Sequence, residues 1–444
     1  MNANVRITTL PKKFHDAVER WRDMYLPDYQ FLLDHWDKYF PRDPTFCLCA
    51  YRQCGMSDII EVGDLKGQPK YTRARDMAVE QGVHLLGAIR AQASTEFGSI
   101  QQHQLTLARA QDEEDQFWIL RMMAEELRHG YQMLHLMLED DWTGASKKGA
   151  AEMVEEILQM RTGSHVLGAF NIDYDSFVDN VVFCALIDRV GKYQLSMQKV
   201  SAYKPMAESM PPMLHEEAFH LAAGVVPLRR WVQRAAAGEV YITMDIIQRH
   251  LNKWVPRGLD MFGDERGGGT NVRYGLKTMG NQEALDQYYA EAQKLVDDLN
   301  ERYVRARLPQ LSSDEAEALL RRARDHGEAA QGVRPEDLLR LPDRRFLRRR
   351  GMHAYQLYGI NGEPFADSAA FANDLPRHLP EQYRAGRDFK DYLELTRQVA
   401  AGQLKPEDAV KKMPSLRRVG GVCPCSRAVR WVRDEEANGG SGAP

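Results

Sequence analysis

The pattern of the stretch Glu125-Glu126-Leu127-Arg128-His129 is repeated 91 residues later in Glu216-Glu217-Ala218-Phe219-His220. Both stretches read E-E-x-x-H, and both lie in sequence that is typical of apolar helices. Residues i and i+3 share one helix face, so the second glutamate and the histidine of each copy point toward one spot. The repeated phrase therefore predicts two helices that present matching pairs of metal-ligating side chains.

A lone carboxylate precedes each copy at nearly the same distance. Glu96 lies 30 residues before Glu126, and Asp188 lies 29 residues before Glu217. A helix, a turn and a second helix of about 30 residues in all would return the lone carboxylate alongside the pair. The pattern predicts an all-α fold built on a four-helix bundle.

Together these positions supply four carboxylates and two imidazoles, the ligand set of a di-iron or di-manganese centre inside a bundle. Hard carboxylate oxygens combined with imidazole suit iron or manganese better than copper or structural zinc. The bare E-x-x-H pattern is weak, and solvated acids beside ordinary histidines are the alternative. The apolar surroundings of both copies disfavour that alternative. The candidate ligands are Glu96, Glu126, His129, Asp188, Glu217 and His220.

The bulk composition is that of an ordinary globular chain. It has 444 residues, of which 43% are hydrophobic, and a formal charge of −4. We expect no nucleic-acid partner, because the charge is near neutral. No apolar run reaches the roughly 18 residues of a membrane span, and the first residues lack the apolar region of a signal peptide. These features, with six unevenly placed cysteines, predict a cytoplasmic protein with reduced thiols.

Composition and breaker residues divide the chain into four parts. Residues 1–70 are expected to form an irregular layer, 71–310 the metal-binding bundle, 311–434 a helical extension and 435–444 a disordered tail. Helices are expected over about 71–110, 112–138, 173–200, 213–222, 242–261 and 281–307. Breaks are expected at Tyr203-Lys204-Pro205 and at Met210-Pro211-Pro212, just before the helix with the second ligand pair.

Two polar residues near the ligands have candidate roles. Gln92 lies one turn before Glu96 and is predicted to face the same cavity, where it would bind substrate or a water molecule. A core glutamine satisfied by backbone is the equally weighted alternative. Arg128 is next to His129, and we expect it to form a salt bridge that orients the ligands. Its alternative is a plain interhelical ion pair.

Four further features are weaker signals. The basic run from Arg344 to Arg350 could bind phosphates, although a solvated helix face is the commoner explanation. Cys47, Cys49 and Cys54, like the pair Cys423 and Cys425, match no standard zinc spacing, and buried free thiols are favoured. Tyr131, two residues after His129, could be a radical tyrosine, but a chain with 18 tyrosines makes coincidence more probable. Gly267-Gly268-Gly269 is expected to be a flexible loop and not a phosphate-binding one.

The duplicated ligand set resembles the ferritin-like di-iron carboxylate proteins. Within them, the order Glu96, Glu126, Asp188, Glu217, with aspartate in third place, is most similar to the oxygenase component of benzoyl-CoA epoxidase. The catalytic subunit of phenylacetyl-CoA epoxidase is the next most similar. The resemblance covers about residues 70–310.

The resemblance implies a ferritin-like bundle that carries two iron ions, with manganese as the alternative metal. It implies an O2-dependent monooxygenase that epoxidises an aromatic or unsaturated acyl-CoA, supplied with electrons by a separate flavin and iron-sulfur reductase. A homodimer is possible. Alternatives with the same ligand set are a desaturase, an N-oxygenase, a radical-generating subunit, and a ferritin or manganese catalase.

Overall fold

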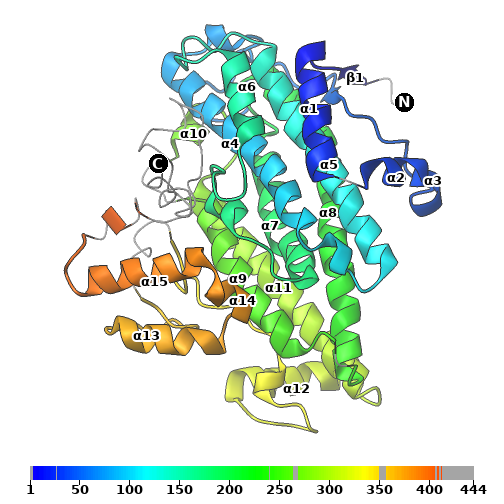
Figure 1. The fold of residues 1–444 in the computed structure, drawn as a ribbon, viewed down its shortest axis with the longest axis vertical. Helices are drawn as coiled ribbons and strands as arrows, with labels where there is room; N and C mark the ends of the chain where they lie inside the picture. Colours follow the sequence, from blue (N-terminus) through cyan, green and yellow to red (C-terminus); the bar gives the residue numbers. More distant parts are fainter. Residues whose placement is uncertain are drawn as a thin grey trace, which may run out of the picture.

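Four long helices run side by side through the centre of the molecule and carry all six candidate ligands (Figure 1). The structure is a computed structural model that describes residues 4–26, 28–239, 241–263, 269–349, 357–405, 408–409 and 412. The helices are α4 (Val79–Gln104), α5 (Glu113–Leu138), α7 (Phe177–Gln198) and α8 (Lys204–Ala236). The fold is an all-α helical bundle, which confirms the expected fold class.

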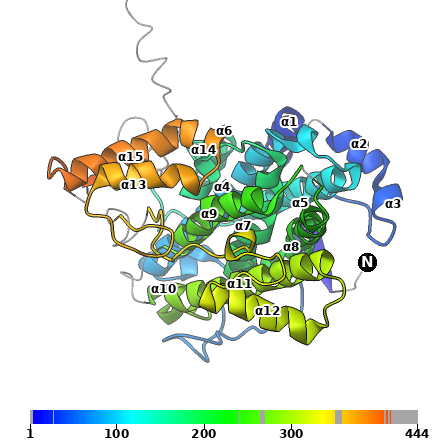
Figure 2. The same cartoon turned by 90° about the horizontal axis from the view of Figure 1, so that it is seen from below.

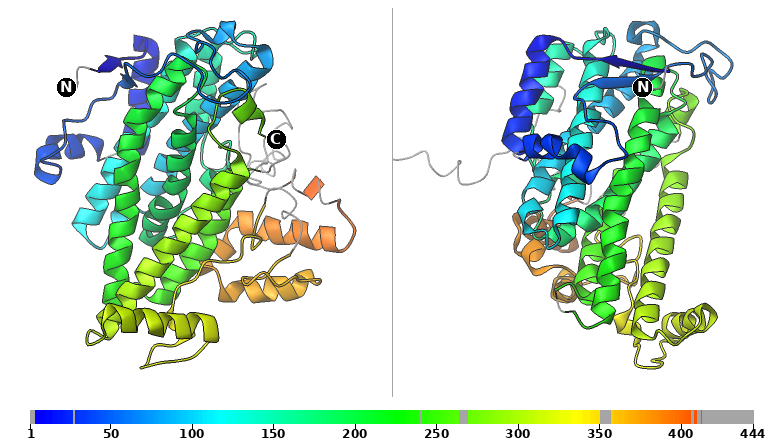
Figure 3. Two further views of the ribbon diagram at one scale, coloured as in Figure 1. Left: turned by 180° about the vertical axis from the view of Figure 1, so that it is seen from behind. Right: turned by 90° about the vertical axis from the view of Figure 1, so that its right-hand side faces the viewer.

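The four helices pack as two hairpins. Helix α4 packs against α5, α7 packs against α8, and α5 also contacts α8. Only short links join the two helices of each hairpin, so their directions are antiparallel. The view from behind shows α8 running the full length of the bundle, with α11 beside its lower part (Figure 3). This arrangement turns one face of each helix toward a shared interior.

Helices α7 and α8 approach most closely at Gly224. A Cβ atom on Gly224 would lie only 2.3 Å from the backbone nitrogen of Ala185. Glycine removes that clash and lets the two backbones touch. The contact lies one turn from His220 on α8 and from Asp188 on α7, so it brings these two candidate ligands to one level.

The connection between the two hairpins is a long crossover fastened to α4. It contains α6 (Ala150–Gln159) and the short helix η3 (Gly168–Asn171). The buried amides of Gln101 and Gln102 donate to the carbonyl oxygens of Met160 and Ala169, at 3.0 and 2.8 Å. The side-chain N–H groups of these two glutamines thereby find acceptors in the crossover backbone and fasten it to α4.

The N-terminal layer is more regular than its composition suggests. It contains α1 (Lys12–Tyr25), α2 (Tyr29–Asp34), α3 (Trp36–Tyr39) and an antiparallel pair of strands, β1 (Val5–Thr8) and β2 (Ala50–Gln53). Helix α1 contacts α4, α2 contacts α5, and β2 contacts both α5 and α8. The layer therefore covers the α5–α8 side of the bundle.

Further helices cover the remaining faces. Helix α9 (Met244–Met261) packs on α7, and α11 (Asn281–Arg307) packs on α8. Seen from below, the C-terminal helices α13 to α15 lie on the opposite side of the bundle from α1 to α3 (Figure 2). The other elements are η1 (Ala74–Asp76), η2 (Leu107–Arg109), α10 (Thr270–Arg273), α12 (Ser313–His326), η5 (Pro335–Asp337), α13 (Ser368–Asp374), η7 (Leu375–Arg377), α14 (Glu381–Ala385) and α15 (Arg387–Ala400).

The expected break at Met210-Pro211-Pro212 is wrong. Helix α8 begins at Lys204 and continues through both prolines. Each proline removes one helical hydrogen bond, yet it also fixes φ near the helical value. Burial offsets the loss, because Met206, Met210 and Met213 all lie in the core, each contributing about 1.5–3 kcal/mol. Helix α4 likewise begins later than expected, at Val79, because a 3-10 turn precedes it.

Two expectations about other segments also change. Cys47 and Cys49 are paired as a disulfide with a Cα–Cα distance of 5.7 Å, whereas free thiols were expected; Cys54 and Cys184 are free. The basic run is not the solvated helix face that was favoured for it: it forms a turn, Arg344 pairs with Asp286, and the buried Arg348 pairs with Asp260. Several predictions fall outside the described residues, namely those on Arg350, Cys423, Cys425, Gly267, Gly268 and the tail 435–444.

Among the described helices, none combines the length and apolar character that a bilayer crossing requires.

Candidate metal centre

The six candidate ligands converge in the bundle interior. Glu96 comes from α4, Glu126 and His129 from α5, Asp188 from α7, and Glu217 and His220 from α8. None of the six is more than 5% exposed to solvent. The helical spacing that predicted a shared face therefore also produces a shared, water-excluded interior.

Glu126 and Glu217 each face both histidines. The Nδ1 atom of His129 lies 3.6 Å from Glu126 and 3.8 Å from Glu217. The Nδ1 atom of His220 lies 3.7 Å from each of the same two glutamates, through their other carboxylate oxygens. Glu96 lies 3.9 Å from the Nδ1 atom of His129. Both carboxylates thus lie between the two histidines, and each imidazole together with them would make one cation position.

These separations fit ligand atoms that share an ion. They are too long for hydrogen bonds, but two atoms each about 2.1 Å from one ion lie roughly 3–4 Å apart. Glu126, His129 and His220 also offer ligand atoms within 4.8 Å of one another. Five buried ligand atoms have no hydrogen-bond partner: Glu126 Oε2, His129 Nδ1, Asp188 Oδ2, Glu217 Oε2 and His220 Nδ1. Such orphaned atoms are rare in folded proteins, and bound cations would satisfy all of them.

The first glutamate of each E-E-x-x-H phrase braces the histidine of the other phrase. Glu216 Oε2 lies 2.9 Å from His129 Nε2, and Glu125 Oε2 lies 3.2 Å from His220 Nε2. A carboxylate at Nε2 keeps a proton there and leaves Nδ1 free to bind a metal. The doubled glutamate in both copies was the sequence signal for these two residues, although their crosswise pairing depends on the fold.

Two arginines hold the bracing carboxylates. Arg128 forms an ion pair with Glu216, which is the salt bridge expected for it. Arg121 Nε donates to Glu125 Oε1 at 3.1 Å. Both arginines line a surface groove of about 520 Å³ bounded by aromatic residues of α3 and the loop after it. Each histidine is thus linked through a carboxylate to an arginine that lines this groove.

Burial shifts the pKa values of the ligands in a consistent direction. Removal from water raises the pKa of Glu96, and it raises the pKa values of Glu126 and Glu217 well above the ordinary value, with further repulsion from neighbouring carboxylates. It raises the pKa of Asp188 to about 7. Burial lowers the pKa of His129 well below its ordinary range, so this imidazole is neutral, as a metal ligand must be. Four crowded carboxylates beside the neutral imidazole of His129 make a site that cations would stabilise.

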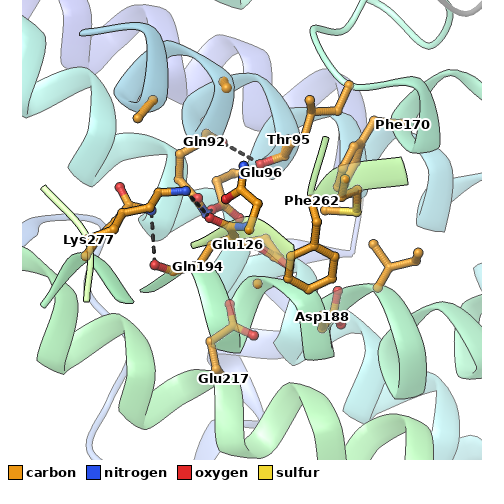
Figure 4. Close-up of a pocket in the computed structure, with 18 residues that line it drawn as sticks. Gln92, Thr95, Glu96, Glu126, Phe170, Asp188, Gln194, Glu217, Phe262 and Lys277 are labelled. Atoms are coloured by element: carbon orange, nitrogen blue, oxygen red, sulfur yellow. Dashed lines mark hydrogen bonds between the residues drawn. The ribbon is translucent and has the colours of Figure 1, made fainter. Parts of the chain in front are cut away.

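A cavity of about 160 Å³ adjoins the four carboxylates (Figure 4). Gln92 lines it, as expected, and its amide donates to Glu96. Phe170 and Phe262 supply apolar walls, and Gln194 and Lys277 lie on the other side in the same view. Its volume is close to the about 150 Å³ of an apolar cavity that accommodates a benzene ring, but its lining is partly polar.

Two other side chains near the ligands, Tyr131 and Cys184, make hydrogen bonds that stabilise the structure. Tyr131 turns toward the N-terminal layer, where its hydroxyl accepts from the backbone of Leu10 at 2.7 Å and contacts His15 at 2.8 Å. It therefore anchors that layer. Cys184, one turn before Asp188, has a raised pKa because it is buried, so its thiol stays protonated and donates to Asp188. Nothing in the sequence had pointed to Cys184.

Comparison with known proteins identifies an oxygenase component as a relative of the chain. No family model matches the chain. Over 248 residues it is 27% identical to benzoyl-CoA oxygenase component B of Aromatoleum evansii. The chain is a distant relative of that oxygenase component. The match covers 51% of this chain and 50% of the relative, so the chain spans about half the length of the protein that it matches.

The crossed bracing leads to a first prediction. Replacing Glu216 with alanine is expected to weaken metal binding at the His129 position by about 10- to 100-fold, because the imidazole loses the partner that orients it. Binding at the His220 position, braced by Glu125, should change little. Competitive titration with a metal chelator would measure both affinities, with the exposed Glu114→Ala as control. Equal loss at both positions would contradict the crossed arrangement.

Proposed function

We propose that the chain is the oxygenase subunit of a multicomponent monooxygenase with a ferritin-like di-iron site. The observation that carries this proposal is the set of five buried, partnerless ligand atoms on Glu126, His129, Asp188, Glu217 and His220. Their number and kind match two cations of the type that carboxylate and imidazole prefer. Manganese has the same ligand preference and is the alternative metal.

The proposed reaction transfers one oxygen atom from O2 to an aromatic or otherwise unsaturated acyl thioester. The second oxygen atom leaves as water, with two electrons and two protons from outside the chain. When bound, a pair of iron ions would supply the electrons that dioxygen needs to attack an unreactive ring. The electron donor is proposed to be a separate flavin and iron-sulfur reductase, in line with the relative's name as one component of an oxygenase.

The chain's own residues would perform the remaining tasks. Glu126 and Glu217 each face both histidines and would hold the metal ions between them. Phe170 and Phe262 exclude water and pack against the substrate. Gln92 fixes Glu96 through its amide and lines the cavity. A substrate-sized cavity beside the carboxylates favours substrate oxidation over iron storage.

Metal analysis combined with turnover would test this proposal. Protein purified from iron-supplemented cells is expected to hold about two irons per chain. With a chemical reductant it should consume O2 faster when benzoyl-CoA is present, and the product should gain one oxygen atom from labelled O2. Metal-loaded protein that neither consumes O2 nor oxidises any aromatic acyl-CoA would overturn the proposal.

A further inference from the structure

One cation lines the cavity beside the candidate metal centre. Among the described residues that line this cavity, Lys277 is the basic one. Its side chain lies across the cavity from Phe170 and Phe262 (Figure 4). It belongs to the segment between α10 and α11, distant in sequence from every candidate ligand. No E-E-x-x-H phrase or helical spacing pointed to it.

The backbone around Lys277 is held firmly. The carbonyl oxygen of Gly275 accepts from Ala202 at 2.8 Å, and the backbone nitrogen of Thr278 donates to Met197 at 3.1 Å. Gly275 has a φ of +70°, and a Cβ there would lie 2.8 Å from Ile60. These contacts fasten the segment to the end of α7, so the lysine side chain enters the cavity from a fixed point.

The ammonium group of Lys277 has one described partner. It donates to Gln194 Oε1 at 2.7 Å. Among the described residues, no carboxylate oxygen lies within ion-pair distance of it. Burial alone lowers its pKa to about 8, so the group remains largely protonated near neutral pH. An ammonium has three donors, so two remain for a ligand.

A fully buried lysine provides the contrast to the partly buried Lys277. Lys253 is wholly buried but lies 3.0 Å from Asp175 and 2.9 Å from Asp179. Attraction to these two carboxylates offsets its burial, and its pKa is raised. Lys253 is therefore a structural cation with its own counter-charges. Lys277 has a neutral amide partner and a cavity instead, which is costly unless something else pairs with it.

We propose that Lys277 binds the acyl oxygen of the substrate and so selects carboxyl-derived compounds. This inference rests on the proposed function, since it assigns a ligand to the cavity of the same site. The ring would lie between Phe170 and Phe262, close to the four carboxylates, with its acyl oxygen at the ammonium group. Both a thioester carbonyl and a free carboxylate offer such an oxygen. A hydrocarbon or a thioether offers none.

Binding of two matched compounds would test the inference without turnover. Benzoyl-CoA carries the acyl oxygen, whereas S-benzyl-CoA has a methylene group in its place. Titration calorimetry on the intact chain is expected to show that Lys277→Met weakens benzoyl-CoA binding by about 10- to 100-fold, the range for a hydrogen bond to a charged group. Binding of S-benzyl-CoA should stay within about twofold. Lys294→Met, at an exposed position of α11, is the matched control and should alter neither.

A further variant and a further ligand distinguish failure of the Lys277 proposal from failure of the oxygenase proposal. Lys277→Gln keeps a donor without the charge and should give an intermediate loss, which guards against a folding defect in the methionine variant. Equal effects on both CoA compounds, or no effect on either, would overturn the role of Lys277 while leaving the oxygenase proposal intact. Failure of the wild-type chain to bind benzoyl-CoA, S-benzyl-CoA and benzoate alike would overturn both. Binding of benzoate that depends on Lys277, with no binding of benzoyl-CoA, would support the acyl-oxygen site and replace the thioester by a free acid.

Discussion

Replacing His220 with alanine is expected to remove one of the two proposed metal ions and to lower O2 consumption by at least about 100-fold. In the proposed site His220 would supply the nitrogen ligand at one position, and its Nδ1 atom has no hydrogen-bond partner. The His129 position keeps its own nitrogen and both spanning carboxylates. Iron analysis should therefore fall from about two ions per chain to about one.

Replacing a carboxylate that faces both histidines is expected to lower the iron content more than replacing one histidine. Glu126 lies 3.6 Å from His129 Nδ1 through one oxygen and 3.7 Å from His220 Nδ1 through the other. Glu126→Ala should therefore weaken both positions and bring the iron content below one per chain. His326→Ala, at an exposed histidine of α12, is the control for the loss of an imidazole. A His220→Ala protein with two irons and undiminished O2 consumption would contradict the assignment.

Local periodicity explains how much of this site was predictable. The i and i+3 spacing in each E-E-x-x-H phrase, and the similar distance back to Glu96 and Asp188, were enough to predict four helices that meet at six side chains. The structure brings those side chains together. Their role as metal ligands stays a prediction that metal analysis must test.

Features that depend on tertiary contacts could not be predicted from the sequence. The phrases showed doubled glutamates, but only the packing of α5 on α8 reveals that Glu125 braces His220 and Glu216 braces His129. Proline rules predicted a break that core burial of α8 overrides. Lys277 enters the cavity from a loop, and loops carry no periodicity by which to place a side chain.

Removing the metal is expected to lower the thermal unfolding temperature, and the difference should grow as pH rises from about 5 to 8. Burial raises the pKa of Asp188 from 3.8 to about 7 in the metal-free chain. Between these values the folded chain holds a proton that the unfolded chain has lost. The free energy of unfolding of the metal-free protein therefore falls as pH rises through this window.

Metal binding has the opposite dependence, because the carboxylates must be deprotonated to bind. Each ion present at 1,000 times its dissociation constant adds about 4 kcal/mol to the free energy of unfolding. Calorimetry of metal-loaded and chelator-treated protein at several pH values would measure the gap, which should be small at pH 5 and largest near pH 8. Asp188→Asn should reduce this pH dependence, because it removes the group that titrates near 7. A gap that stayed constant with pH would mean that these carboxylates do not hold the metal.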